Sequence, residues 1–343
     1  MKATEDSKPD SKAQKDAAPK SRVRSASLLG VLAALGCETL FGLSYLFTKS
    51  ATNAHATELA LLAWRFIFAA AFMLLLVALR VIRLELRGKR LGPLLLISLF
   101  SPVTYFVGET FGISHTTASE TGIILGACPV VTLIAAALIL RIKPKLRELF
   151  GIFIAVAGVV VATVAKGIEA SFNVFGYAML ALAAVSYALY VVYVVRARAF
   201  SAWEKTFVLD LVGVITFVTL AVAEAVSLGA AGRGEIGGSG TPVTNLVTLF
   251  ALPFNHPGFT VAAAYQGVGC SVVAYFLSIV AIAKIGANRT ASFVGFATVV
   301  SVVAAVIFLG ESITWLQVFG AVVIVAGVYI ANINKERGKN SSA

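Results

Sequence analysis

The feature that most limits how this chain folds is an internal repeat. The segment from Gly126 to Ala162 reappears in related form, without a gap, as the segment from Gly295 to Ala331. Each copy is largely apolar and long enough to hold parts of two membrane-spanning helices. The repeat therefore predicts two copies of one helical bundle fused in a single membrane chain, an arrangement that points first to a transporter.

The composition also indicates a lipid environment. Hydrophobic residues make up 59% of the chain and charged residues only 13%, so the polar surface is too small to cover a soluble domain of this length. The formal net charge of +11 comes from short basic clusters between apolar runs, without an aromatic or glycine-rich nucleic-acid motif beside them. We therefore expect a lipid bilayer, and no nucleic acid, as the partner of this surface.

The cysteines and the amino-terminal stretch exclude further classes. Cys37, Cys128 and Cys270 lie in apolar runs without Cys-x-x-Cys spacing, which suits buried small side chains better than a disulfide or a metal site. Residues 1–25 are polar and are expected to form a disordered cytoplasmic tail. The apolar run that follows is too long for the hydrophobic region of a signal peptide, so we interpret it as a retained first membrane helix.

Apolar runs of about twenty residues, the length that crosses the hydrocarbon core, predict ten membrane helices. Five fall in a repeat at 26–165 and five in a repeat at 174–333, joined by an outer linker at 166–173. Because five is an odd number, the two repeats must cross the membrane in opposite directions. The predicted fold class is an all-α membrane protein of two inverted five-helix repeats. The expected spans are 26–49, 58–80, 91–114, 116–140, 145–165, 174–196, 202–227, 259–284, 287–309 and 314–333.

The basic residues test this count independently. With the amino terminus in the cytoplasm, the lysine and arginine clusters fall in inner loops, as the positive-inside rule requires. We expect both termini, including a tail at 334–343, in the cytoplasm, and the chain in the cell membrane, as the inner membrane of a bacterium. The inner clusters lie at 80–90, 141–147, 196–205, 284–289 and 335–339.

The longest connection, at 228–258, is predicted to lie outside the membrane. It contains the run Gly237-Gly238-Ser239-Gly240, and its apolar piece Leu246–Leu252 is too short to span. Two interpretations stay open, a short helix resting on the outer membrane surface and a disordered insertion.

Several short motifs occur in the order found in one known family. They are Trp64-Arg65-Phe66, Pro129-Val130, Leu309-Gly310-Glu311, Gln317, Gly320 and Gly327. With the duplication, they make residues 26–333 resemble the drug/metabolite transporter superfamily, specifically its ten-helix EamA-type branch. The resemblance implies two homologous five-helix halves and metabolite export. It also implies a central cavity formed by the first, third, fourth, sixth, eighth and ninth helices.

Charged residues inside the predicted spans are candidates for the transport site, because each is costly in lipid. Glu38 lies about halfway along the first span, and Arg65 lies at a similar depth in the second span, which runs the other way. We therefore expect Glu38 and Arg65 to face each other, either as a structural ion pair or as part of the substrate site. Glu38 and Glu109 are the carboxylates best placed to bind a coupling proton.

Aromatic residues on the spans that the resemblance places around the cavity are further candidates. Such rings can stack on a substrate and hydrogen-bond it through tyrosine hydroxyls. Packing or lipid-facing roles are the alternative. The candidates are Tyr105, Tyr187, Tyr190, Tyr275 and Phe296.

Proline and glycine indicate where helices bend and where they pack closely. Pro102 and Pro129 lie near mid-membrane and are expected to kink their helices, either to expose carbonyls to a cavity or simply because proline is common in membrane helices. Small residues in the fifth and tenth spans predict close helix packing. They are Gly151, Gly158, Gly320 and Gly327.

Catalytic motifs are missing from the sequence, including the phosphate-binding glycine loop, HExxH and GxSxG. We expect no enzyme activity, no cofactor and no metal. The predicted function is secondary transport of a small metabolite, such as an amino acid or a derivative, outward by alternating access around a midplane site. The alternatives are efflux of amphipathic drug-like cations, nucleotide-sugar transport, and a membrane enzyme or binding protein that does not transport.

Overall fold

The computed structural model describes residues 20–53, 56–140, 146–167, 173–194, 197, 199–234, 240–285, 290 and 293–332. Within these ranges the ordered elements are helices, and no β-strand is found. Of the tail expected to be disordered at 1–25, residues 1–19 fall outside the described residues, and residues 20–25 belong to a helix that begins at Lys20, so the expectation is wrong for them. The predicted tail at 334–343 also falls outside the described residues. The prediction of an all-α protein is confirmed for the part of the chain that the structure describes.

Seven of the described helices are long and apolar enough to cross a membrane. They coincide with seven of the ten predicted spans. Three shorter apolar helices, Leu149–Gly158, Val294–Leu309 and Trp315–Ile330, lie within the other three. A multi-pass membrane protein is therefore confirmed, while the count of ten crossings stays a prediction.

The first half of the chain follows the predicted spans, with local signals that set where helices begin. Thr57 caps the second helix by accepting a hydrogen bond from the amide of Ala60, and Thr117 with Glu120 forms a capping box before the fifth. The elements are α1 (Lys20–Asn53), α2 (Glu58–Ala78), α3 (Gly92–Ser98), the π-helical η1 (Leu99–Thr104), α4 (Tyr105–Ser114), α5 (Ala118–Leu125), α6 (Cys128–Leu140) and α7 (Leu146–Gly167).

Two of the predicted spans in this half are interrupted beside a proline. Pro102 lies in η1 directly after Ser101, whose φ of −147° and ψ of 121° are not helical. Pro129 lies in the first turn of α6, after the break that separates α6 from α5. Proline cannot donate the backbone hydrogen bond that a continuous helix requires, which accounts for the position of both breaks.

Besides the helices of its predicted membrane spans, the second half contains one helix in the long connection. Its elements are α8 (Val174–Val194), α9 (Ala202–Ala230), α10 (Pro242–Asn255), α11 (Pro257–Ala264), the π-helical η2 (Tyr265–Ala274), α12 (Tyr275–Ile285), α14 (Val294–Leu309) and α15 (Trp315–Asn332).

The extra element, α10, lies in the connection for which two interpretations were open. It is a helix of 14 residues that includes the whole apolar piece. Asn245 donates hydrogen bonds to the carbonyls of Ala225 (3.1 Å) and Arg233 (2.9 Å), and Trp64 on α2 donates one to Leu249 (2.9 Å). The described part of this connection is therefore a packed helix rather than a disordered insertion.

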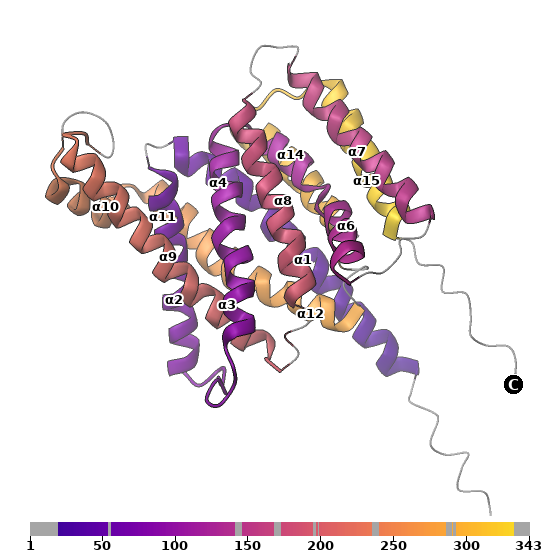
Figure 1. Cartoon of the computed structure of the whole chain (residues 1–343), viewed down its shortest axis with the longest axis horizontal. Coiled ribbons are helices and arrows are strands. Elements are labelled where there is room, and N and C mark those ends of the chain that lie inside the picture. The colour runs from indigo at the N-terminus through magenta and orange to yellow at the C-terminus, as the bar shows by residue number, and fades with distance from the viewer. Residues whose placement is uncertain are drawn as a thin grey trace, which may run out of the picture.

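The helices α7 and α15 lie side by side along their length at one edge of the bundle, opposite α10 (Figure 1). A Cβ atom on Gly158 would lie 2.9 Å from the carbonyl oxygen of Gly320, and one on Gly327 would lie 2.7 Å from that of Gly151. Only glycine allows backbones this close. The predicted close packing of these two helices is confirmed.

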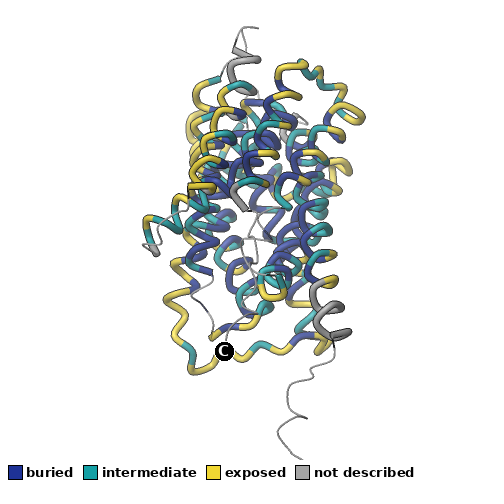
Figure 2. Tube along the Cα trace, turned by 90° about the vertical axis from the view of Figure 1, so that its right-hand side faces the viewer, coloured by how far each residue is buried: buried dark blue, intermediate teal, exposed yellow. Residues whose placement is uncertain are grey.

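Buried residues run through the middle of the bundle, and exposed residues lie mainly at its periphery (Figure 2). Large apolar side chains such as Leu138, Phe153 and Phe308 are more than two-thirds exposed. An exposed apolar rim around a packed interior is the pattern expected of a protein whose outer solvent is lipid. The same interior also holds buried polar residues, which mark the candidate site.

Candidate functional site

A small central cavity, with about 40 Å³ of free space, lies among the helices of both halves. It is lined from α1, α4, α5, α8, α12 and α14, the helices of the first, third, fourth, sixth, eighth and ninth predicted spans, and by Cys128 at the start of α6. On α1, Glu38, Phe41 and Tyr45 share one face because they recur at helical spacing. The free space is enough for a few water molecules and far smaller than a ligand pocket of ordinary size, so the structure has a contracted cavity.

Tyrosines form most of the polar wall of this cavity. Tyr105 and Tyr187 have ring centroids 6.0 Å apart, Tyr187 and Tyr190 6.2 Å, and Tyr190 and Tyr275 5.9 Å. Tyr45 adds a fifth ring to the wall. These separations are those of interacting aromatic pairs, so the rings form one continuous aromatic surface.

Glu38 is the charged member of the described residues that line the cavity. Its side chain is 5% exposed, and no hydrogen bond or ion pair joins it to another described residue. No lysine, arginine or histidine stands among the described lining residues. The cavity therefore combines one acidic group with several electron-rich ring faces.

The expected pairing of Glu38 with Arg65 is wrong. The ion pair of Arg65 is with Glu109 on α4, with 3.6 Å between Nη1 and Oε2. The expectation rested on depth along the helix axis, which fixes one coordinate of a side chain but not the direction in which it leaves the helix. Glu38 faces the cavity, whereas Arg65 faces the space between α2, α4 and η2.

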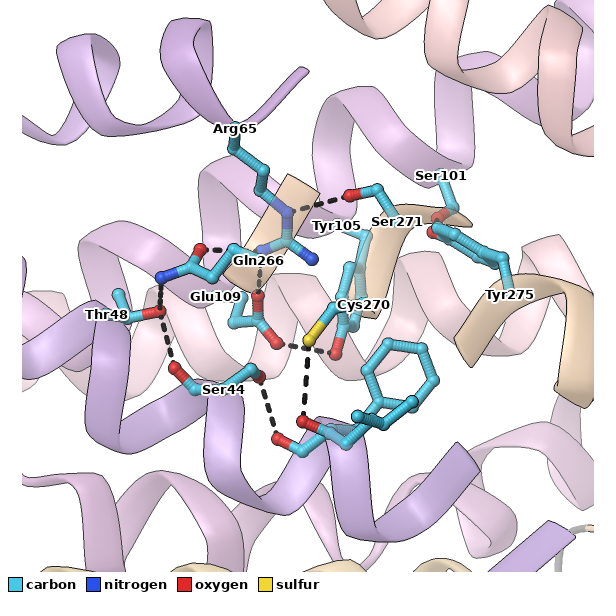
Figure 3. A network of polar contacts seen from close by, with 12 residues as sticks. Ser44, Thr48, Arg65, Ser101, Tyr105, Glu109, Gln266, Cys270, Ser271 and Tyr275 are labelled. Atoms are coloured by element: carbon cyan, nitrogen blue, oxygen red, sulfur yellow. Dashed lines mark hydrogen bonds and ion pairs between the residues drawn. The ribbon is translucent and has the colours of Figure 1, made fainter. Parts of the chain in front are cut away.

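Arg65 is fully buried and joins the two halves of the chain (Figure 3). Its Nε donates to the hydroxyl of Ser271 and its Nη1 to the side-chain oxygen of Gln266, both at 3.0 Å, and both acceptors lie on η2. Its guanidinium lies 3.8 Å from the ring centroid of Phe106. Hydrogen bonds, a carboxylate and a ring face together offset the cost of burying this charge, although Nη2 has no hydrogen-bond partner among the described residues.

Two cavity tyrosines connect the cavity wall with this polar interior. The hydroxyl of Tyr105 donates to Glu109 Oε1 at 2.9 Å. The hydroxyl of Tyr275 hydrogen-bonds that of Ser101 at the break in η1 (Figure 3). A solute that draws either hydroxyl into the cavity must therefore disturb a contact outside it.

The structure brings some of the predicted site residues to the cavity wall and places the others behind it or beside it. It brings Glu38, Tyr105, Tyr187, Tyr190 and Tyr275 to the cavity wall. Glu109 and Arg65 lie one layer behind that wall, and Pro102 and Pro129 lie at helix breaks close to it.

Phe296 lies outside the cavity, with 42% of its surface exposed. Its neighbours on α14, Val294, Ala297 and Thr298, line the wall instead. Adjacent helix positions point about 100° apart, because a turn holds about 3.6 residues. Phe296 is therefore removed from the set of cavity residues.

Gly310 and Glu311 of the sequence motifs, together with Glu120, hold the ends of helices. Gly310 ends α14 in the left-handed conformation, with φ of 64°. Glu311 accepts hydrogen bonds from the amides of Ala118 (2.9 Å) and Ser119 (3.0 Å) and so caps α5. Glu120 accepts a hydrogen bond from the hydroxyl of Tyr177 at 2.7 Å. These carboxylates are structural caps rather than freely solvated groups.

A second hollow, of about 300 Å³, lies between α14, α15 and Ile123 of α5. Its wall is apolar apart from Thr298, and half or more of the surface of Val299, Val303 and Val322 is exposed at the rim of the bundle. A specific site needs a few convergent polar groups. The smaller central cavity has them, so it is the better candidate.

Sequence reasoning missed Tyr45 in the wall and the two partners of Arg65 on η2. A usable signal existed for the partners, because Gln266 and Ser271 are polar residues inside an apolar span. Nothing in the sequence indicated that a π-helical segment would present them to α2. These contacts depend on the backbone path of η2.

Comparison with known proteins decides the family. The sequence profile of the EamA-like transporter family matches residues 28–164 and again residues 174–333. The chain belongs to the EamA-like transporter family. Its two matched segments agree with the two halves expected from the internal repeat. This EamA-like transporter is thus a multi-pass protein of the cell membrane.

Relatives of this chain include two bacterial transporters and a plant protein. YcxC of Bacillus subtilis strain 168, an uncharacterized transporter, is 32% identical over 308 residues, which cover 89% of this chain and 93% of YcxC. YyaM of the same organism, also an uncharacterized transporter, is 28% identical over 297 residues, 82% of this chain and 88% of YyaM. The WAT1-related protein At1g44800 of Arabidopsis thaliana is 27% identical over 237 residues, 64% of this chain and 61% of that protein.

One solved crystal structure has the same fold. It superposes on the EamA-like transporter with a TM-score of 0.60 at 18% sequence identity, and the match covers 90% of this chain and 97% of the other. At this identity the likeness concerns the arrangement of helices alone.

Proposed function

We propose that this EamA-like transporter is a secondary transporter that exports a small organic solute carrying a positively charged nitrogen and an apolar or aromatic body. The observation that carries the proposal is the cavity wall, in which Glu38 is the charged group among tyrosine rings. A carboxylate attracts a cation directly, and ring faces attract it through their quadrupole. The central place of the cavity, between helices of both halves, supports alternating access around it.

Free amino acids, the leading substrates expected from the sequence, fit this wall less well. Their ammonium group suits Glu38, but their carboxylate would need a cation, and none stands among the described lining residues. Arg65, the nearest buried cation, already has Glu109, Gln266 and Ser271 as partners. Amines and amino-acid derivatives with a masked carboxylate therefore fit better than zwitterions.

The topology proposed with this function is an inverted repeat of ten crossings with both termini in the cytoplasm. The glycine contacts between α7 and α15 support it, because they are reciprocal. Gly158 meets Gly320 and Ile324, while Gly327 meets Gly151 and Ala155. Contacts farther along α7 fall earlier along α15, so the two copies meet antiparallel about a two-fold axis that passes between the two helices. Two parallel copies would not make such contacts.

Solute counterflow in proteoliposomes tests the substrate class with three compounds that share one ring. Tyramine is a cation, tyrosine a zwitterion and 4-hydroxyphenylacetate an anion at neutral pH. We expect saturable exchange of labelled tyramine, weaker exchange of tyrosine and none of the anion. Liposomes without protein and liposomes with Glu38→Gln are the controls.

The outcomes separate the alternatives. Equal exchange of tyramine and tyrosine would favour the amino-acid reading, and exchange of the anion alone would refute a cation site. Absence of saturable exchange for tyramine, for tyrosine and for a lipophilic cation, by protein shown to be folded, would contradict transport of this class. Export, which the EamA-type resemblance favours, is then tested in cells by comparing efflux from loaded cells with and without the protein.

A further inference from the structure

Asp210 is a buried carboxyl group that the cavity does not use. Asp210 lies on α9 and is 1% exposed. Neither of its carboxyl oxygens has a hydrogen-bond partner among the described residues. It is also the single aspartate of the chain outside the amino-terminal stretch, where the others are Asp6, Asp10 and Asp16. A carboxyl group in this position is costly and needs a physical explanation.

The elements packed against α9 bring few titratable groups to Asp210. Arg65 on α2 and Tyr275 on α12 are close enough to interact with it electrostatically. The other titratable residues of these neighbours are Glu58 on α2, Tyr265 and Cys270 on η2, and Lys284 on α12. Neither α3, η1 nor α10 carries any.

The remaining charges nearby belong to groups that already have partners. On α9 itself, Glu204 is paired with Lys89 at 2.8 Å, and Lys205 donates to the carbonyl of Val194. Arg65 is the cation that faces Asp210 from a neighbouring helix, but its ion pair at 3.6 Å is with Glu109 on α4. Its free nitrogen, Nη2, makes no hydrogen bond to Asp210. Among the described residues, Arg65 is therefore the buried cation that faces two buried carboxyl groups, those of Glu109 and Asp210.

This charge balance points to a proton on Asp210. If Arg65, Glu109 and Asp210 were all ionised, the buried cluster would carry one uncompensated negative charge, which a low-dielectric interior disfavours strongly. A hard metal cation such as sodium would need several oxygen ligands around it. The described neighbourhood offers Asp210 one additional free oxygen on its own helix face, the buried hydroxyl of Thr206. A proton needs no ligand shell at all.

We propose that Asp210 is a proton-binding site separate from the substrate carboxylate Glu38, and that its proton is the coupling ion of transport. Tyr275 provides the physical connection between the two sites. Its ring lines the cavity, its hydroxyl bonds Ser101, and it lies within electrostatic range of Asp210. Loss of the proton to one aqueous side leaves a carboxylate that competes with Glu109 for Arg65, the residue that joins α2 to η2. The coupling half of this proposal rests on the proposed transport function.

Infrared spectroscopy tests the proton without any transport assay. The full chain is made by cell-free synthesis with ¹³C-carboxyl-labelled aspartate or glutamate, in a background with Asp6→Asn, Asp10→Asn and Asp16→Asn. In that background Asp210 is the labelled aspartate that remains. At neutral pH we expect a carboxylic-acid C=O band that shifts to lower frequency with labelled aspartate and is unmoved by labelled glutamate. The same triple-substituted chain without labels is the matched reference.

Two spectral results would overturn the proton site. Absence of a carboxylic-acid band would mean that Asp210 is ionised, and a band that shifts only with labelled glutamate would place the proton on a glutamate such as Glu38 or Glu109. Because this readout needs no substitution at Asp210, it is independent of whether a variant at that position folds.

Proteoliposomes test the coupling and distinguish its failure from failure of the proposed function. We expect Asp210→Asn, which mimics the protonated form, to keep tyramine counterflow without a gradient and to lose the stimulation that an imposed pH gradient gives to the wild type. Wild-type exchange that does not respond to the gradient would overturn the coupling alone. Gradient stimulation that survives in Asp210→Asn would assign the coupling proton elsewhere, and the absence of wild-type exchange would refute the proposed function.

Discussion

Replacement of Arg65 by glutamine is the perturbation whose cost the structure defines best. The change removes a buried cation, two hydrogen bonds at 3.0 Å and a cation–π contact at 3.8 Å, and it leaves Glu109 without its ion pair. Breaking a buried pair from one side costs about 3–5 kcal/mol, because an uncompensated charge stays behind. We expect Arg65→Gln to lower the stability of the folded bundle by that amount.

Lys89→Gln is the matched control. Lys89 also faces a buried carboxylate, and its contact with Glu204 is shorter, at 2.8 Å against 3.6 Å for Arg65 and Glu109. The side chain of Lys89 is 30% exposed, whereas that of Arg65 is 1% exposed. A pair open to water contributes at most about 1 kcal/mol. Distance alone would rank Lys89→Gln as the more damaging change, and burial ranks it as the milder one.

The buried cysteines supply the assay. Cys37, Cys128 and Cys270 are all at most 3% exposed, so a thiol-reactive fluorophore reports their release as the solubilised protein is heated. The variants Arg65→Gln, Glu109→Gln, their combination and Lys89→Gln are compared under one scan rate. We expect the double variant to be about 0.5–3 kcal/mol more stable than the sum of the two single losses predicts. Equal losses for Arg65→Gln and Lys89→Gln, or strict additivity of the pair, would refute the reasoning.

Three further experiments test the site, the packing and the topology. Glu38→Gln should raise the half-saturation concentration for tyramine counterflow at least about tenfold, while its thermal unfolding stays near that of the wild type; unchanged transport would remove Glu38 from the site. Gly327→Leu should destabilise the bundle by about 1–3 kcal/mol, because its Cβ would lie 2.7 Å from the Gly151 carbonyl oxygen, and a neutral result would show that α7 and α15 can separate. Arg87→Cys should react with a membrane-impermeant maleimide only from the cytoplasmic side and Arg233→Cys only from outside, and labelling of both from one side would refute the ten-helix topology.

The sequence predicted the seven long apolar helices and the acidic residue of the cavity wall with four of its five tyrosines, but not the other residues that line it. Apolar runs predict helices well because lipid leaves the backbone no alternative to internal hydrogen bonds. Glu38 was predicted because a charged group inside such a run is costly and faces protein rather than lipid, which is a local property of the segment. Tyr187 and Tyr275 were predicted because the family resemblance placed their spans around the cavity.

Pairings between segments were not predicted, because they depend on how each helix is rotated. The depth of Arg65 in the membrane suggested that it lies opposite Glu38. The orientation of α2 about its own axis instead points the Arg65 side chain towards Glu109. The same uncertainty put Phe296 in the cavity, although only its neighbours on α14 line the wall. The connection at 228–258 was left open between a short helix and a disordered insertion for a related reason, since α10 is held by contacts of Asn245 and Trp64 that no local sequence pattern indicates.

The irregular segments η1 and η2 link the architecture to the proposed transport cycle. Each lies in the third membrane-crossing helix of its half, and each ends where a cavity tyrosine begins the next α-helix, Tyr105 after η1 and Tyr275 after η2. Irregular backbone at membrane depth is tolerated only where protein or a cavity surrounds it, and π-helical turns occur often at functional sites. A change of register in either segment would rotate its tyrosine and move the contact with Glu109 or Ser101 that the hydroxyl makes. In the proposed alternating access, we expect paired hinges of this kind, one in each half, to let the two sides of the cavity widen in turn while the remaining helices keep their packing.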